Sequence, residues 1–143
     1  MKKLKVFALL SIICMLFGAI GHAQIQPPPL TVTRNDVGSS IGGTLTVNMR
    51  EFTGGFQLSR GSRSLTNGAS GTFTGDGITS LGVYSFNVVI PGVGTSAYYA
   101  LPLTYTDSQI IVFNLGSSSI AVTVYRTGDL TWGLSAIYGP PVG

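Results

Sequence analysis

Hydrophobic and polar residues alternate with a period of two over most of the chain after residue 30. In residues 44–50, polar residues separate the hydrophobic side chains of Leu45, Val47 and Met49. Successive side chains of a strand point to opposite faces, so this pattern predicts a strand with one buried and one solvated face. The same alternation marks residues 84–90, 99–105, 111–115, 120–124 and 130–138, and shorter candidates are residues 30–34, 56–59 and 71–74. No window has the 3.6-residue period of an amphipathic helix.

Short connections that contain glycine join the last predicted strands. Residues 116–119 separate two runs of β-prone residues, and Thr127 and Gly128 separate the next two. Such connections are typical of hairpins, so the last third of the chain predicts a three-stranded antiparallel meander. Eight or nine strands at spacings of about 8 to 12 residues predict an all-β antiparallel sandwich, of jelly-roll or immunoglobulin-like type.

The first 23 residues have the pattern of a secretory signal peptide. Three lysines precede an apolar stretch over residues 6–20, and the small residues Gly21 and Ala23 offer a cleavage site, with Ala23 preferred. The apolar stretch is shorter than the roughly 20 residues needed to span a bilayer, and no later stretch is a candidate span. We therefore expect a secreted protein that is located outside the cell, on its surface or in the periplasm, and the leader suggests a bacterium. The expected organisation is a signal peptide (1–23), a proline-rich arm (24–29), one β-sandwich domain (30–138) and a Pro/Gly tail (139–143).

Cleavage changes the charge of the protein. The sequence has eight basic and five acidic residues, and three of the basic residues are the lysines of the leader. The mature chain therefore has five arginines against five acids, which makes it neutral. A neutral chain lacks the basic surface that nucleic-acid binding needs, and low net charge favours self-association.

Cleavage also removes the only cysteine and the only histidine, Cys14 and His22. Serine and threonine are then left without a histidine or lysine base, so nucleophilic catalysis is not expected. Zinc or iron sites built on histidine or cysteine are excluded in the same way. The carboxylates are the remaining acid and base groups, and we expect Asp107 and Asp129 to be turn residues. The prediction is a protein that is not an enzyme and has no metal and no cofactor.

Residues 54–77 are rich in glycine and predict exposed loops, where binding sites are often found. Arg60 and Arg63 lie in this stretch and could bind an acidic glycan or a carboxylate. Asp76 lies between two glycines, with no second acid within ten residues, which favours a tight turn over a calcium site. These three residues are candidate ligand-binding residues.

Two aromatic residues complete the candidate ligand site, because aromatic rings can stack on sugars. Trp132 alternates in phase with Leu130 and Leu134, which favours the core over a sugar platform. Tyr98 and Tyr99 are neighbours in the chain, so a strand would turn one of the two rings away from the core. We name Tyr98 as the exposed ring.

Residues 109–115 form an uncharged, proline-free and strongly β-prone segment. At a sheet edge such a segment promotes association with other chains. We expect a central strand buried on both faces, and the alternative is an assembly interface.

The function that these observations favour is a secreted structural or adhesive β-domain at the cell surface or outside the cell, with a second copy of itself or a surface glycan as partner. A monomeric carbohydrate-binding module is one alternative. A fimbrial subunit that donates a strand, with residues 30–33 as that strand, is another. A small hydrolase that uses two carboxylates is the third.

Overall fold

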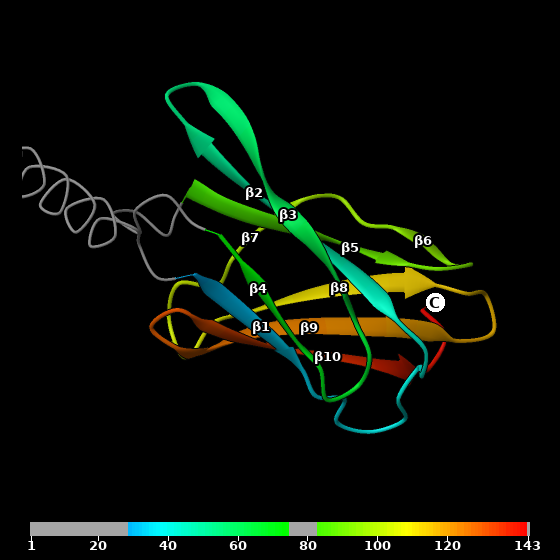
Figure 1. Cartoon of the computed structure of the whole chain (residues 1–143). Helices are drawn as coiled ribbons and strands as arrows, with labels where there is room; N and C mark the ends of the chain where they lie inside the picture. The colour runs from blue at the N-terminus through cyan, green and yellow to red at the C-terminus, as the bar shows by residue number, and fades with distance from the viewer. Residues whose placement is uncertain (1–28, 75–82, 143) are drawn as a thin grey trace, which may run out of the picture.

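The structure, a computed structural model, describes residues 29–74 and 83–142 and is all-β in these residues. Its strands form two sheets, which is consistent with the expected β-sandwich (Figure 1). The predicted leader, residues 24–28 of the proline-rich arm, Asp76 and the final residue of the tail lie outside the described residues. Within residues 29–74 and 83–142, no helix is long and apolar enough to cross a membrane.

Sheet A contains five strands in the order β4-β1-β10-β9-β8. Their bounds are Ser70–Phe73 (β4), Leu30–Arg34 (β1), Thr131–Gly139 (β10), Ser119–Gly128 (β9) and Ser108–Asn114 (β8). The strands β8, β9 and β10 follow one another as antiparallel hairpins, so the predicted meander is confirmed. β1 is the exception, because it pairs in parallel with β10 and antiparallel with β4.

Sheet B contains the order β3-β2-β5-β6, and a short strand β7 also pairs with β5. The bounds are Phe56–Leu65 (β3), Leu45–Thr53 (β2), Tyr84–Ile90 (β5), Gly94–Thr95 (β6) and Tyr99–Ala100 (β7). Figure 1 shows the β2–β3 hairpin extending well beyond the two layers. The described residues form ten strands instead of the predicted eight or nine, and β6 and β7 are only two residues each.

The inward residues of the two sheets form one hydrophobic core. Leu45, Val47 and Met49 of β2 are buried as their alternation predicts, and so are Val122 and Val124 of β9. Burial of alternate residues on both layers removes apolar surface from water. Each Å² of buried apolar surface stabilises the fold by about 25 cal/mol. The hydrophobic residues that recur at every second position therefore lie on the faces of the two sheets that pack against each other.

The predicted strand over residues 99–105 is wrong beyond Ala100. The chain leaves the sheet at Leu101 and Pro102, which are buried, whereas Leu103 and Tyr105 are exposed. Proline has no N–H for a ladder hydrogen bond and is therefore rare in paired strands. The alternating side chains of this stretch do not share one face of a sheet.

The prediction of exposed loops over residues 54–77 is also wrong for most of that stretch. Gly54 and Gly55 form the turn of the β2–β3 hairpin, and residues 56–65 and 70–73 are strands. The shorter strand candidates at residues 56–59 and 71–74 are therefore confirmed, the second up to Phe73. β3 is largely exposed on both faces, so its composition of serine, glycine and arginine resembles that of a loop. Pairing with β2, which a local pattern does not reveal, keeps these residues extended.

Candidate assembly surface

The segment of residues 109–115 lies at the edge of sheet A and not in its centre, so the prediction of a central strand is wrong. Among the described strands, β8 has one neighbour, β9. Only Ile111 is buried within β8, whereas Ile110 and Val112 are 56% and 51% exposed. A β-prone, apolar composition predicts burial, but here it belongs to an exposed edge.

The free edge of β8 presents backbone hydrogen-bonding groups. An antiparallel ladder alternates between pairs that exchange hydrogen bonds and pairs that do not. The N–H of Leu115 donates to the carbonyl of Ser118 (2.9 Å), and the register continues without a shift to the start of β8. Every second residue before Leu115 therefore directs its N–H and C=O groups to β9, and these residues are Phe113, Ile111 and Gln109. The residues that direct their N–H and C=O groups to the free edge are Ser108, Ile110, Val112 and Asn114.

A side-chain contact agrees with this assignment. The Gln109 side-chain amide donates to the carbonyl oxygen of Ile110 at 3.4 Å. That carbonyl is therefore accessible from outside the β8–β9 ladder, as a group on the free edge should be.

The outer faces of the two sheets differ in chemistry. On sheet A, Ile110 and Val112 lie opposite Thr123 and Ala121 of β9, and β8 contains no charged residue. On sheet B, side-chain hydrogen bonds cross the strands. They join Asn48 to Asn87 (2.8 Å), Ser62 to Asn48, and Arg50 to Ser85 (3.0 Å). The outer face of sheet B satisfies its own polar groups, whereas the β8 side of sheet A leaves an apolar strip in solvent.

The other strand edges carry features that block association. β3 has a register shift opposite Met49 and Arg50, and it carries the exposed, charged side chain of Arg63. Bulges and charges of this kind are common protections of sheet edges. β6 and β7 have only two residues each, which is too short to template another strand. β8 has seven residues without a bulge, a proline or a charge.

β4, the other edge strand of sheet A, contacts β3 at one corner of the two sheets. A Cβ atom at Gly71 would lie 2.7 Å from Cβ of Arg63, so only glycine permits this approach. The guanidinium of Arg63 lies 5.5 Å from the ring centre of Phe73 and bonds the carbonyl of Ser62. Arg63 therefore closes a corner of the fold and lies in a strand, not in the predicted loop.

Arg60 also lies in strand β3, where it is paired with an acid. Its Nε donates to the Glu51 carboxylate at 2.7 Å, and both side chains are largely buried. Arg60 therefore forms an ion pair and Arg63 packs at a corner of the fold, although the sequence predicted one shared loop site for both. Both arginines lie in strand β3.

The β2–β3 hairpin carries a second exposed apolar cluster near its tip. Phe56 is 73% exposed and Leu58 is also exposed, whereas the exposed Phe52 lies on the opposite face of the hairpin. Leu58 pairs with the buried Glu51, so Leu58 and Phe56 lie on the face of sheet B that covers the core elsewhere. The hairpin extends this face past the region where the two layers meet (Figure 1).

Tyr98 is partly exposed, but it precedes β7 and is not part of a strand. The guanidinium of Arg50 lies 3.6 Å from the centre of its ring, within the range of a cation–π contact. One face of the ring is therefore covered by Arg50.

Trp132 is completely buried, as the alternation with Leu130 and Leu134 predicts. Its indole N–H donates to the carbonyl of Pro102 at 2.8 Å. A ring in this position cannot stack on a sugar, so its interpretation as a ligand platform is wrong. The contact instead ties residues 101–103 to the core.

A cluster of polar residues holds the 101–107 segment against the β9–β10 turn. Asp129 lies in that turn, as predicted, and its carboxylate accepts a hydrogen bond from the Tyr105 hydroxyl at 2.8 Å. This bond, together with burial and the negative charge of Asp129, raises the pKa of Tyr105 above 10.0 despite the opposing charge of Arg126. Arg126 also bonds the carbonyls of Leu103 and Asp129. Asp107, the other expected turn residue, is exposed and directly precedes β8.

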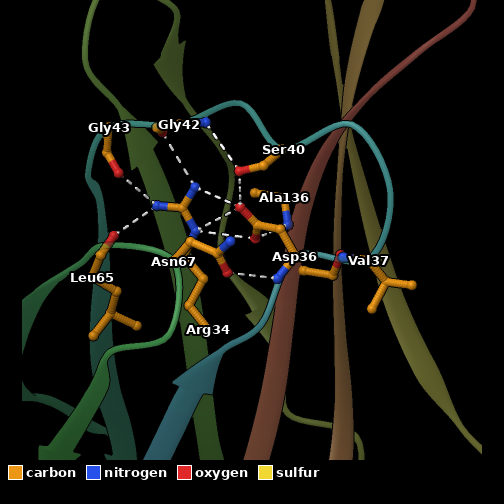
Figure 2. Close-up of polar contacts among 10 residues, drawn as sticks. Arg34, Asp36, Val37, Ser40, Gly42, Gly43, Leu65, Asn67 and Ala136 are labelled. Carbon is orange, nitrogen blue, oxygen red and sulfur yellow. Dashed lines mark hydrogen bonds and ion pairs between the residues drawn. The ribbon is translucent and has the colours of Figure 1, made fainter.

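The most deeply buried polar contacts join Arg34 to Asp36 (Figure 2). Both side chains are completely buried, and Nη2 of Arg34 lies 2.8 Å from Oδ2 of Asp36. Nε of Arg34 also donates to the Asp36 carboxylate, and the remaining N–H groups donate to the carbonyls of Gly42, Gly43 and Leu65. All five N–H groups of the guanidinium therefore have an acceptor, which is the condition for burying an arginine.

The carboxylate of Asp36 is equally well satisfied. It accepts hydrogen bonds from the Ser40 hydroxyl and from the N–H of Ala136 in addition to those from Arg34. Burial alone raises the pKa of Asp36, but these hydrogen bonds and the positive charge of Arg34 outweigh it and hold the pKa below 3.8. The cluster joins β1, the loop after it, β10 and the end of β3, and it leaves no group free for a ligand.

Sequence reasoning missed this cluster, although a signal was present. Arg34 continues the inward stripe of Leu30 and Val32, so the alternation placed an arginine on the buried face. A charge at an inward position must have a buried partner. Asp36, two residues later, was the nearest candidate.

Other candidate chemistry is sparse in the part of the chain that the structure describes. It contains no group of three or more histidine, cysteine or acidic side chains that could hold a metal. A pocket of about 220 Å³ at one end of the sheets is lined mainly by aliphatic residues and glycines, with Thr44 and Tyr138 as its polar members. Asp76 lies outside the described residues.

No protein-family model, no curated protein and no solved structure matches this chain. The interpretation of its function therefore depends on its own residues.

Proposed function

We propose that this protein is a secreted structural or adhesive β-domain that acts outside the cell or on its surface and assembles with copies of itself. The observation that carries the proposal is the unprotected edge of β8. Among the described strands it is the longest edge without a charge, a proline, a bulge or a covering strand, and it exposes Ile110 and Val112 beside backbone groups that bond no other described strand. Such an edge invites another strand.

The charges of the described residues support a structural role. Arg34 pairs with Asp36 and Arg60 with Glu51, so the two buried acids are engaged by arginines. The equal numbers of arginines and acids in residues 24–143 add little repulsion between copies.

Among the two fold types expected, we favour the immunoglobulin-like one. The parallel pairing of β1 with β10 departs from the antiparallel sheets of a jelly roll.

The alternatives have less support. A glycan platform would depend on Tyr98, which already stacks with Arg50. A fimbrial subunit that donates residues 30–33 would have to release a strand that lies between β4 and β10 and is followed directly by the buried Arg34.

Size-exclusion chromatography with light scattering tests the proposal. The protein is expressed from its full sequence, recovered in its mature form and measured over a range of concentrations. We expect oligomers that dissociate on dilution, and we expect Val112→Lys to shift the protein to monomer because it places a charge on the β8 edge. Thr72→Lys is the matched control, since Thr72 is exposed on the outer face of sheet A at the opposite edge.

Circular dichroism and the fluorescence of Trp132 establish that both variants are folded. A wild-type protein that stays monomeric at high concentration would remove the proposal. So would a Val112→Lys variant that assembles like the wild type.

A further inference from the structure

The β8 edge is complementary to itself in one particular register. We infer that two copies join through antiparallel pairing of their β8 strands, about a twofold axis that passes beside Ile111. The inference rests on the proposed function, because it names the partner and geometry of the same edge.

The free backbone groups of β8 limit how a second strand can pair with it. Ser108, Ile110, Val112 and Asn114 direct their N–H and C=O groups away from β9, as derived above from the Leu115–Ser118 hydrogen bond. In an antiparallel ladder, a residue with outward groups must pair with another such residue, since those pairs exchange two hydrogen bonds.

This requirement selects the register. When the axis passes beside Ile111, Ser108 lies opposite Asn114 of the other copy and Ile110 lies opposite Val112. All four outward residues of each copy then find a partner. A shift of the axis to Ile110 or to Val112 leaves one of the four in each copy unpaired. A shift of one strand by a single residue, which places the axis between two residues, opposes outward groups to inward ones.

The side chains of β8 favour the same register as its backbone groups. On the outer face, Ile110 of one copy lies beside Val112 of the other, so the exposed aliphatic strips of the two copies meet. Cross-strand pairs of β-branched residues stabilise sheets. β8 contains no charge, so no like charges oppose each other across the axis.

Symmetry makes the arrangement closed. A twofold axis uses the same surface on both copies, so both β8 edges are consumed and the assembly ends at a dimer. The two copies of sheet A become one continuous sheet, and the unprotected edge disappears.

Cysteine crosslinking tests the register. Ile110→Cys and Val112→Cys are made in separate chains that also carry Cys14→Ser, because Cys14 is the only cysteine in the sequence. Both positions are exposed, so the fold should tolerate the changes. Each variant is oxidised alone and as an equal mixture, and the products are separated on a non-reducing gel.

The mixture should form a disulfide dimer that contains one chain of each kind. Residues in a hydrogen-bonded pair have Cα atoms about 5.5 Å apart, within the range for a disulfide. Each variant alone should crosslink poorly, because identical residues are then offset by two positions along the strand and lie about 8 Å apart. Spin labels on the same cysteines give a second readout, with stronger dipolar broadening in the mixture than in either variant alone.

The outcomes separate this inference from the proposed function. Preferential crosslinking of Ile110→Cys alone or of Val112→Cys alone would place the axis elsewhere and overturn the register. A dimer by light scattering that gives neither crosslinks nor broadening would place the interface away from β8. A monomer by light scattering would remove the proposed function as well.

Discussion

Arg34 and Asp36 form an ion pair of 2.8 Å in which both side chains are completely buried. The two residues are close in sequence, but their other hydrogen-bond partners come from distant segments, including Leu65 and Ala136. The pair therefore joins four parts of the chain at one point (Figure 2).

Asp36→Asn should lower the free energy of unfolding by about 3–5 kcal/mol, because it leaves the guanidinium of Arg34 buried without a counter-charge. Urea unfolding followed by circular dichroism measures the change. Asp107→Asn is the matched control, since Asp107 is exposed, and it should change stability by less than about 0.5 kcal/mol. Equal effects of the two substitutions would contradict a structural role for the ion pair.

The contribution of Asp36 should depend on pH with a defined sign. Its pKa in the folded protein lies below the ordinary value of 3.8, so folding favours the ionised form. The contribution is complete above the unfolded pKa of about 3.9 and is lost as the pH falls through the folded value. The difference in unfolding free energy between wild type and Asp36→Asn should therefore narrow below about pH 4. A difference that stays constant or widens under acid conditions would argue against this assignment.

Gly133→Ala should be destabilising only while Tyr125 is present. A Cβ atom at residue 133 would clash with Cζ of the Tyr125 ring, which covers this glycine from the neighbouring strand. We expect a loss of about 1 kcal/mol from the crowding. In a Tyr125→Ala background the same change should be neutral or stabilising by about 0.5 kcal/mol, because glycine within a strand costs conformational entropy.

A double-mutant cycle in urea measures this coupling. Additive effects of the two substitutions would mean that the ring does not restrict residue 133.

Tyr105 should titrate above the ordinary tyrosine range. The hydrogen bond to Asp129 and the negative charge of that residue raise its pKa above 10.0, so Asp129→Asn should lower it. Side-chain NMR of Tyr105 across the alkaline range, in the wild type and in Asp129→Asn, measures the shift. An unchanged titration in Asp129→Asn would show that the contact is not maintained in solution.

Several features of the fold could be predicted from local pattern alone. The strands β2, β5, β9 and β10 follow from alternation, and the hairpins of the last third follow from short connections between β-prone runs. The burial of Trp132 followed from the same alternation, because its neighbours in phase are leucines.

The errors share one cause, which is that local pattern does not report what lies beside a segment. β3 resembles a loop because both of its faces are largely exposed, and it is extended because β2 pairs with it. β8 resembles a central strand because it is apolar, yet the strand order leaves it at an edge. The stripe over residues 99–105 failed where Pro102 ends the pairing.

The sequence by itself determined which residues alternate and which turns can be tight, because these depend on the geometry of a few consecutive residues. It also determined the neutral charge of residues 24–143 and the absence of cysteine, histidine and lysine there. Only the tertiary structure decided which strands are neighbours, where Arg34 finds its acceptors and which edge is left unprotected. Those features depend on contacts between segments up to 100 residues apart, such as Asp36 with Ala136, and no local pattern encodes them.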